Sequence, residues 1–330
     1  MRQLWSGWPW QVRAKSGTLA LALGENSIRY VFATATSEQK ANVNAWGTVQ
    51  RGTNGREAFM KRVKLALPPA ARTIAVLDPR DYQILQLEAA NVPAEEQRDA
   101  VRWKAVEYLD GPPQDYTFDV LPMTSEAARG NIIAVAARND LVRSQMIDCA
   151  ELGYPLSVID VVETAQRNLL RAALQGQPST LKVAAALVAD SGRALFIVAA
   201  RGELCFFRRF DFDVDTLAVP VDKVQAALMS QGASAETAAR SMMQLNRSLD
   251  LWDHSCPDLP IDVILVDAGA KTGAIIDRIK PEAGIEMRPL DLSKVFKLSS
   301  TSQPAPWQES AYLPLLGALL RSPEPGAISS

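Results

Sequence analysis

The chain has 330 residues, of which 48% are hydrophobic and 22% charged, and its formal net charge is -2 at pH 7. This length supports two domains with their own cores, and the near-neutral charge does not indicate a nucleic-acid-binding surface. No apolar stretch approaches the ~20 residues that a membrane-spanning helix needs. The 3 cysteines are widely spaced and indicate a reducing compartment. Neither the cysteines nor the single histidine form a metal-binding pattern, so no metal site is expected.

Residues 1–16 are predicted to form a separate tryptophan-rich segment. It places Trp5, Trp8 and Trp10 close to several basic residues, without the uninterrupted apolar core of a signal peptide. Tryptophans flanked by cations are typical of a bilayer interface, so these three are candidate membrane contacts. Packing on the folded part or disorder explains the segment equally well, and both interpretations stay open.

Two segments of the chain repeat one design, Gly17 to Ala33 and Val183 to Gly202. Each is an apolar run, a short turn with glycine and small polar residues, and a second apolar run. A strand–turn–strand unit near the start of each half predicts a two-lobed α/β protein built from related halves. In such a protein the two turns face each other across a cleft in which nucleotide phosphates can lie.

The first half adds three strands, two helices and an insertion to its hairpin. Outside the insertion we expect strands at 42–50, 73–77 and 156–159 and helices at 52–67 and 161–174. Within residues 80–155 we expect strands at 81–88, 116–122 and 131–137 and helices at 92–109 and 139–153. This order predicts a small α+β subdomain at 80–155, inserted into a first lobe made of 17–79 and 156–178.

The second lobe is expected to span residues 179–307. Its predicted strands lie at 203–210, 261–266 and 285–289, the last of them at a sheet edge, and its helices at 223–229, 235–252 and 269–280. Residues 298–306 are expected to form a loop. A helix within 308–321 is expected to complete the first lobe, and the Pro/Gly/Ser-rich tail at 322–330 is expected to be disordered.

This order of elements matches the two-lobed actin-like (ribonuclease H-like) fold, and the chain resembles the PilM family of type IV pilus assembly proteins. Within that family it is most similar to the MshI-like branch of MSHA pilus systems. The segments that carry the resemblance are spread over the chain and lie at Asn91–Glu96, Arg102–Lys104, Asp115–Asp119, Gly153–Asp160 and Ala311–Arg321. Residues 211–232 leave little room for the helical subdomain that PilM relatives place there, so a reduced second-lobe helical subdomain is expected.

The resemblance implies a degenerate nucleotide site. The candidate nucleotide-binding residues come from three motifs and are Gly24, Asn26, Ser27, Asp190, Ser191, Gly192, Asp267 and Gly269. PilM-like proteins have an Asp that organises metal and water at the position of Ala22, and Glu25 adds a negative charge to the phosphate-binding turn. We therefore expect no catalytic residue and no bound cofactor. An active Mg-ATP-dependent ATPase or sugar-kinase relative is the alternative.

The resemblance also implies a function, that of a non-catalytic cytoplasmic scaffold at the inner membrane. Such a protein binds the cytoplasmic segment of a PilN-like membrane partner (MshJ in MSHA systems) and other platform proteins. In PilM-like proteins that segment lies in a groove between the first lobe and the inserted subdomain. The candidate groove residues here are Tyr82, Ile84, Leu85 and Trp103. A type II secretion component similar to the cytoplasmic part of GspL is a further alternative.

Overall fold

The computed structural model describes residues 17–35, 40–53, 55–93, 96–121, 123, 127, 130–177, 181–219, 232–299 and 304–321. Three predictions fall outside these ranges, namely the membrane contacts Trp5, Trp8 and Trp10, the helix at 223–229 and the disordered tail. Within the ranges the structure holds no helix with the length and hydropathy that crossing a bilayer requires.

The first lobe is built on a six-stranded mixed sheet. Its strands in spatial order are β14 (Phe296–Leu298), β3 (Ala41–Gln50), β2 (Ser27–Ala35), β1 (Thr18–Leu23), β4 (Arg72–Val76) and β8 (Val158–Asp160). β1, β2 and β3 pair antiparallel, whereas β4 and β8 continue the sheet in parallel. Side chains alternate between the two faces of a strand. In β1, Leu19 and Leu21 therefore face α1 (Arg56–Ala66) and α3 (Asn139–Leu152), and Ala20 faces the interior between the lobes.

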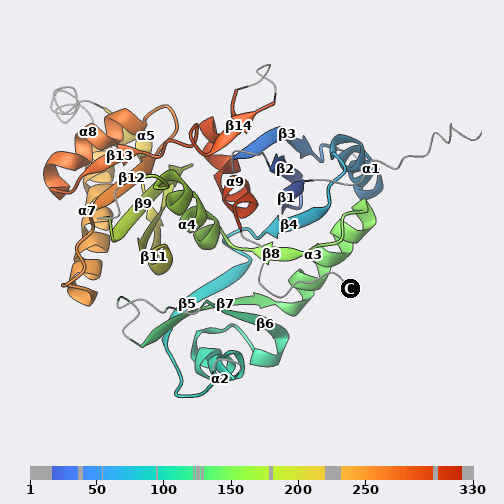
Figure 1. Cartoon of the computed structure of the whole chain (residues 1–330), viewed down its shortest axis with the longest axis horizontal. Coiled ribbons are helices and arrows are strands. Elements are labelled where there is room, and N and C mark those ends of the chain that lie inside the picture. Colours follow the sequence, from blue (N-terminus) through green and yellow to red (C-terminus); the bar gives the residue numbers. More distant parts are fainter. Residues whose placement is uncertain are drawn as a thin grey trace, which may run out of the picture.

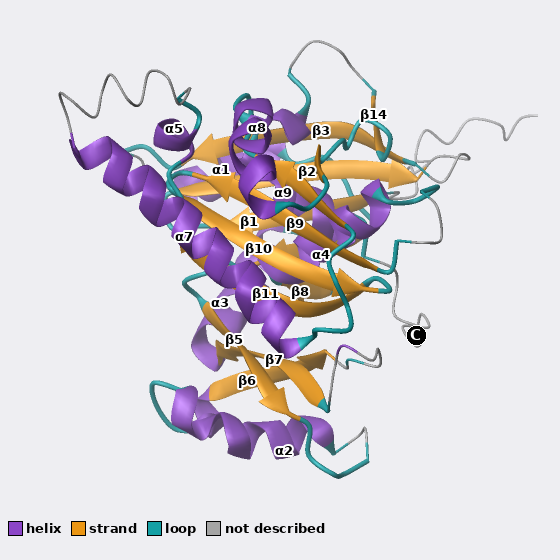
Figure 2. Cartoon of the chain, turned by 90° about the vertical axis from the view of Figure 1, so that its left-hand side faces the viewer, coloured by secondary structure: helices purple, strands orange, loops and turns teal. Residues whose placement is uncertain are grey.

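The second lobe repeats this topology. Its sheet has the order β11 (Glu203–Asp211), β10 (Arg193–Ala200), β9 (Val183–Asp190), β12 (Val263–Asp267) and β13 (Met287–Pro289). β9, β10 and β11 pair antiparallel, and β12 lies parallel to β9, as β4 lies parallel to β1. The helices of this lobe are α5 (Val214–Leu217), α7 (Gly232–Ser255) and α8 (Thr272–Ala283). Figure 2 shows α7 running diagonally beside this sheet. The duplicated hairpins and the edge position of β13 are confirmed.

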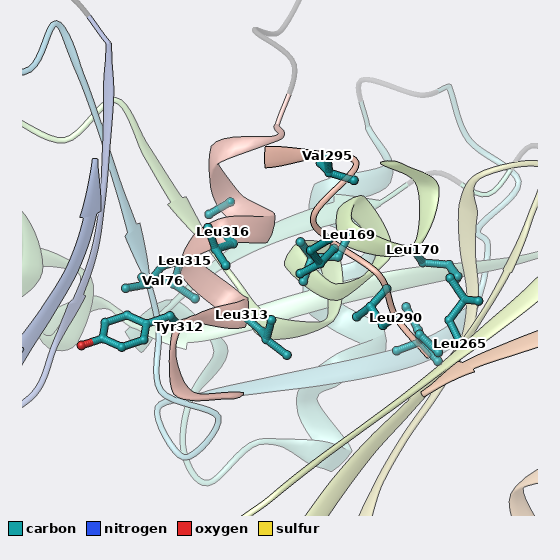
Figure 3. Packing of buried hydrophobic residues seen from close by; sticks show 14 of the residues in the cluster. Val76, Leu169, Leu170, Leu265, Leu290, Val295, Tyr312, Leu313, Leu315 and Leu316 are labelled. Atoms are coloured by element: carbon teal, nitrogen blue, oxygen red, sulfur yellow. The ribbon is translucent and has the colours of Figure 1, made fainter. Parts of the chain in front are cut away.

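Two helices fill the space between the lobes. They are α4 (Val162–Ala173) and α9 (Leu313–Leu319), and the short turns η4 (Pro306–Gln308) and η5 (Ser310–Tyr312) precede α9. Their leucines pack in one buried cluster with Val76 of the first lobe and Leu265 of the second, as Figure 3 shows. α4 and α9 approach so closely that a Cβ at Gly317 would lie 2.1 Å from the carbonyl oxygen of Ala165. This shared core holds the two lobes together.

The inserted subdomain lies below both lobes in Figure 1. It is a three-stranded antiparallel sheet of β5 (Tyr82–Glu88), β7 (Asn131–Arg138) and β6 (Tyr116–Leu121), in that spatial order. One face is covered by α2 (Gln97–Lys104) and the turn η1 (Ala105–Tyr108), and a second turn, η2 (Pro113–Asp115), precedes β6. Val101 and Ala105 are buried against Phe118 and Ala134 in a small core of its own.

The structure differs from the predicted elements at several places. α5, for example, lies in a segment where no helix was expected. β14 pairs in parallel with β3, so part of the segment expected in the second lobe completes the first. α3 packs against α1, with Cys149 and Leu152 in the first-lobe core, although residues 80–155 were expected to form the insertion as one unit. α2 begins at Gln97 rather than near residue 92, because the Gln97 side chain donates to the carbonyls of Ala90 and Val92 and holds the preceding turn.

Candidate functional site

Two adjoining hollows lie at the cleft, one between the lobes and one on the first lobe. The larger, of about 530 Å³, is lined by residues of β9, β10 and β11 on one side and of α4 and the turns before α9 on the other. The smaller, of about 380 Å³, lies at the β1–β2 turn. Both are lined by Arg29, Asp78 and Arg80. Their size and position fit a ligand site, since bound small molecules occupy clefts of this volume at domain boundaries.

The first predicted motif lies at the smaller hollow. Gly24, Asn26 and Ser27 line it, and the Gly24 amide closes the turn by donating to the Ser27 carbonyl over 2.9 Å. Ala22 lines the same hollow at the end of β1, where the resemblance places an Asp. A methyl side chain can neither coordinate Mg²⁺ nor accept a proton. Glu25 also lines this hollow and is exposed, so its negative charge opposes a bound phosphate.

The second motif contributes one residue to the site. Asp190 lines the larger hollow, and the Ser191 hydroxyl donates to its carboxylate over 3.0 Å. Ser191 and Gly192 form the exposed tip of the β9–β10 turn, with φ of 51° and 80°. Such left-handed angles explain the small residues here through turn geometry alone.

The third motif lies behind the larger hollow. Asp267 is nearly buried at the end of β12 and accepts hydrogen bonds from the Gly269 amide (3.3 Å) and the Ser310 hydroxyl (3.2 Å). Burial raises the pKa of Asp267. Ser310 lines the larger hollow, whereas Asp267 and Gly269 are not among its described lining residues. The Asp267 carboxylate thus holds the η5 turn rather than facing the cleft.

Acidic side chains do not gather into a metal site in the described parts of the chain, where no group of three or more His, Cys, Asp or Glu residues could hold an ion. Asp190 and Asp267 each face a hydroxyl or amide donor instead. Cys149, Cys205 and Cys256 are all buried.

Sequence reasoning did not identify the charged pair on the floor of the cleft. Arg80 donates through Nε (2.9 Å) and Nη2 (3.0 Å) to the two carboxylate oxygens of Asp78. This bidentate contact lowers the pKa of Asp78. The pair directly follows the buried strand β4, at the carboxyl end where ligands gather in parallel sheets, and that position is the signal that could have identified it.

Sequence reasoning also did not identify the buried polar residues of α4. Glu163, Thr164, Gln166 and Asn168 are all buried, in a helix that sequence reading treats as an ordinary return to the first lobe. The Gln166 side chain donates to the carbonyls of Ala186 (3.0 Å) and Leu195 (3.1 Å) and so ties α4 to the second-lobe sheet. The signal available in the sequence is the run of polar residues in the first half of this helix, because polar groups that become buried need fixed partners.

The buried residues Tyr82 and Glu163 and the partly exposed Arg209 form a cluster at the lower end of the cleft, hereafter the Arg209 cluster. The Tyr82 hydroxyl donates to Glu163 over 2.6 Å and accepts from Arg209 over 2.5 Å. Arg209 also forms an ion pair with Glu163, lies 4.8 Å from the centre of the Tyr82 ring and donates to the Pro79 carbonyl. Burial and the Glu163 charge raise the pKa of Tyr82 far above its usual range. The cluster joins the insert, the first lobe and the second lobe.

The candidate partner-binding residues do not lie together. Tyr82, Ile84 and Leu85 line a groove of about 400 Å³, hereafter the β5–β11 groove. Its opposite wall is Phe207, Arg208 and Arg209 of the second lobe, whereas the sequence places the partner groove against the first lobe. Gln83 and Tyr108 complete the described lining.

Trp103 lies apart from the groove on the outer surface of α2, where its side chain is 75% exposed. It is not among the described residues that line the β5–β11 groove.

Comparison with known proteins identifies the fold. No protein family and no curated protein matches the sequence. Among solved structures, a chain of a PilM–PilN type IV pilus biogenesis complex superposes with a TM-score of 0.66 over 92% of this chain and 97% of that one, at 16% identity. The cytoplasmic domain of EpsL, an inner-membrane component of the Vibrio cholerae type II secretion system, has a TM-score of 0.48 at 12% identity, covering 93% and 96%. A Bacteroides thetaiotaomicron protein with an actin-like ATPase fold has a TM-score of 0.47 at 9% identity, covering 85% and 93%.

The chain therefore has the mixed α/β, two-lobed actin-like fold, as its element order predicts.

Proposed function

We propose that this chain is a non-catalytic scaffold of a type IV pilus assembly platform, of the MshI-like kind found in MSHA pilus systems. It acts at the cytoplasmic face of the inner membrane. The observation that carries the proposal is the superposition on a chain of the PilM–PilN complex over 92% of the present chain. That share is too large to leave the inserted subdomain out, so the two proteins have both lobes and at least part of the insert in common.

The partner in this proposal is the cytoplasmic segment of a PilN- or MshJ-like inner-membrane protein, and the insert is the surface that binds it. Trp103, Tyr108 and Val106 lie along α2 and η1, with exposed fractions of 75%, 55% and 41%. Exposed aromatic residues on one short segment are typical of protein-binding surfaces, because they bury a large apolar area with little loss of side-chain entropy.

The side chains at the three nucleotide-site motifs support a role as a scaffold. Ala22 cannot hold a metal ion, and Glu25 repels phosphate at the turn that would hold it. The Asp267 carboxylate is engaged by Gly269 and Ser310. The proposal therefore assigns no hydrolysis and no required cofactor to this chain.

The binding assay uses the purified full chain and a labelled synthetic peptide. The peptide corresponds to the cytoplasmic segment of a PilN- or MshJ-like protein. We expect the peptide to bind, and Trp103→Ala to weaken binding about tenfold, a loss of about 1.4 kcal/mol. Leu65→Ala is the matched control, since Leu65 is 79% exposed on α1, away from the insert. Absence of binding to the wild-type chain contradicts the proposal.

Nucleotide binding is the second candidate function, and the 530 Å³ interlobe hollow is the observation that favours it. An ATPase or sugar-kinase relative would bind Mg-ATP and lose turnover on Asp190→Ala. Calorimetry with millimolar Mg-ATP separates the two proposals, because the scaffold gives no binding heat and no phosphate release. Neighbouring type II secretion genes, in place of pilus genes, would favour the GspL-like alternative.

Peripheral membrane contact through Trp5, Trp8 and Trp10 is a further part of the proposal, and these residues lie outside the described ranges. Liposome flotation tests it by comparing the full chain with a version that begins at Lys15. We expect only the full chain to float. Equal recovery of both versions in the unbound fraction contradicts the contact.

A further inference from the structure

The β5–β11 groove is walled by the end strands of two separate sheets. β5 pairs with β7 alone among the described strands, and β11 pairs with β10 alone. An end strand leaves the N–H and C=O groups of its outer edge unpaired within its own sheet. Both walls therefore offer main-chain groups that an added extended segment can bind.

The groove begins at the Arg209 cluster, which joins its two walls at one end. From there β5 runs away through Ile84 and Leu85, while β11 runs toward the cluster through Phe207 and Arg208. The two edges are thus antiparallel to each other along the groove. Ile84, Leu85, Phe207 and Tyr108 make its surface largely apolar.

The charge of the groove is positive. Its described lining contains Arg208 and Arg209 and no acidic residue. Glu163 neutralises Arg209, as shown above. The hydrogen bonds described for Arg208 go to neutral acceptors, which are the carbonyl (3.0 Å) and side-chain oxygens (2.8 Å) of Gln244 and the Ser248 hydroxyl (3.0 Å).

Arg208 is held firmly without an acidic counterion in the described structure. Its guanidinium lies 5.7 Å from the centre of the Phe210 ring. Burial, and to a lesser degree the nearby Arg247 charge, lower the pKa of Arg208. A carboxylate that pairs with this half-buried cation is attracted more strongly than it would be in water, because the surrounding dielectric constant is low.

We propose that the β5–β11 groove binds an extended, acidic segment of a partner protein, whose backbone adds to the edges of β5 and β11 and whose carboxylate pairs with Arg208. The apolar side chains of the segment pack on Leu85, Phe207 and Tyr108. This inference rests on the proposed partner-binding function and deepens it by assigning the conformation and the charge of the bound segment.

Panning of a random 12-residue peptide library on the full chain tests the chemistry without assuming a partner. We expect enriched peptides to combine Asp or Glu with apolar residues. Synthesised, they bind the wild-type chain, bind Arg208→Glu about tenfold more weakly, and bind Arg208→Lys almost as well. Arg240→Glu is the control, because Arg240 pairs with Glu236 on the exposed face of α7. Leu85→Glu, which places a negative charge on the opposite wall, weakens binding if Arg208→Glu fails to fold.

Hydrogen–deuterium exchange gives the structural readout. With an enriched peptide bound, we expect amides of both β5 and β11 to exchange more slowly. Enriched peptides without acidic residues, unchanged affinity in folded Arg208→Glu, or protection confined to one strand overturn the inference. A PilN-like peptide that binds but ignores Arg208→Glu overturns only this inference. Acidic peptides that bind the groove while no PilN-like peptide binds leave it standing and remove the proposed function.

Discussion

Arg209 of β11 and Glu163 of α4 form an ion pair that joins the second lobe to the helix between the lobes. The Glu163 side chain has no exposed surface, so its charge depends on this partner and on the Tyr82 hydroxyl. Arg209 also lines both the larger interlobe hollow and the β5–β11 groove. One side chain therefore forms part of the wall between the cleft and the groove.

Loss of the Arg209 cation is predicted to destabilise the fold. Arg209→Met leaves Glu163 buried without its cation, and we expect a loss of about 3 kcal/mol in urea unfolding. Adding Glu163→Gln removes the buried charge and should recover part of that loss. Arg240→Met, at an exposed pair, should change stability by less than about 0.5 kcal/mol. Equal instability of the single and double variants contradicts the role of the buried charge.

The close approach of α4 and α9 is predicted to require Gly317. In Gly317→Ala the new Cβ meets the Ala165 backbone, so the helices must separate, and we expect a loss of about 1–3 kcal/mol in thermal or urea unfolding. The matched control is Gly273→Ala in α8, where a Cβ meets nothing within 4 Å. That control should be neutral or stabilising by roughly 0.4–1 kcal/mol. Similar changes in stability for both variants would show that α4 and α9 can separate at no cost.

Asp267 is predicted to make stability depend on pH. Burial raises the pKa of Asp267 in the fold. Its favourable contribution to the free energy of unfolding is therefore complete below pH 3.8, and it is lost as the pH rises through the pKa of the folded state. Asp267→Asn keeps an oxygen for Gly269 and Ser310 without the buried charge. We expect a higher melting temperature than wild type at pH 7 and a smaller difference at pH 3.5. Asp253→Asn, at an exposed site, should show no such trend.

Cys149 is predicted to lower the stability of the fold at alkaline pH. Burial, with the Asp148 charge nearby, raises the pKa of Cys149 from 9.0 to about 12. Its contribution to stability is complete below pH 9 and is lost as the pH rises toward 12. Urea midpoints between pH 8 and 11 should fall more steeply for wild type than for Cys149→Ala. Parallel slopes for the two proteins would contradict this assignment.

Much of the fold could be predicted because its signals are local. The two hairpins are specified by pairs of apolar runs and by turn residues such as Gly192 that tolerate left-handed backbone. β14 could not be predicted, since its three residues have only Phe296 buried and their pairing with β3 joins distant parts of the chain. The start of α2 depends likewise on contacts of Gln97 with the preceding turn.

The sequence by itself determined the two-lobed architecture and the altered first turn, because Ala22 and Glu25 change the chemistry wherever that turn lies. Only the tertiary structure decided which surfaces meet. Tyr82, Ile84 and Leu85 line a groove whose opposite wall is β11, and Trp103 does not line that groove. The buried polar residues of α4 find their partners on other elements. The physical reason is that residue pattern specifies which side of an element is buried, whereas packing between elements specifies what buries it.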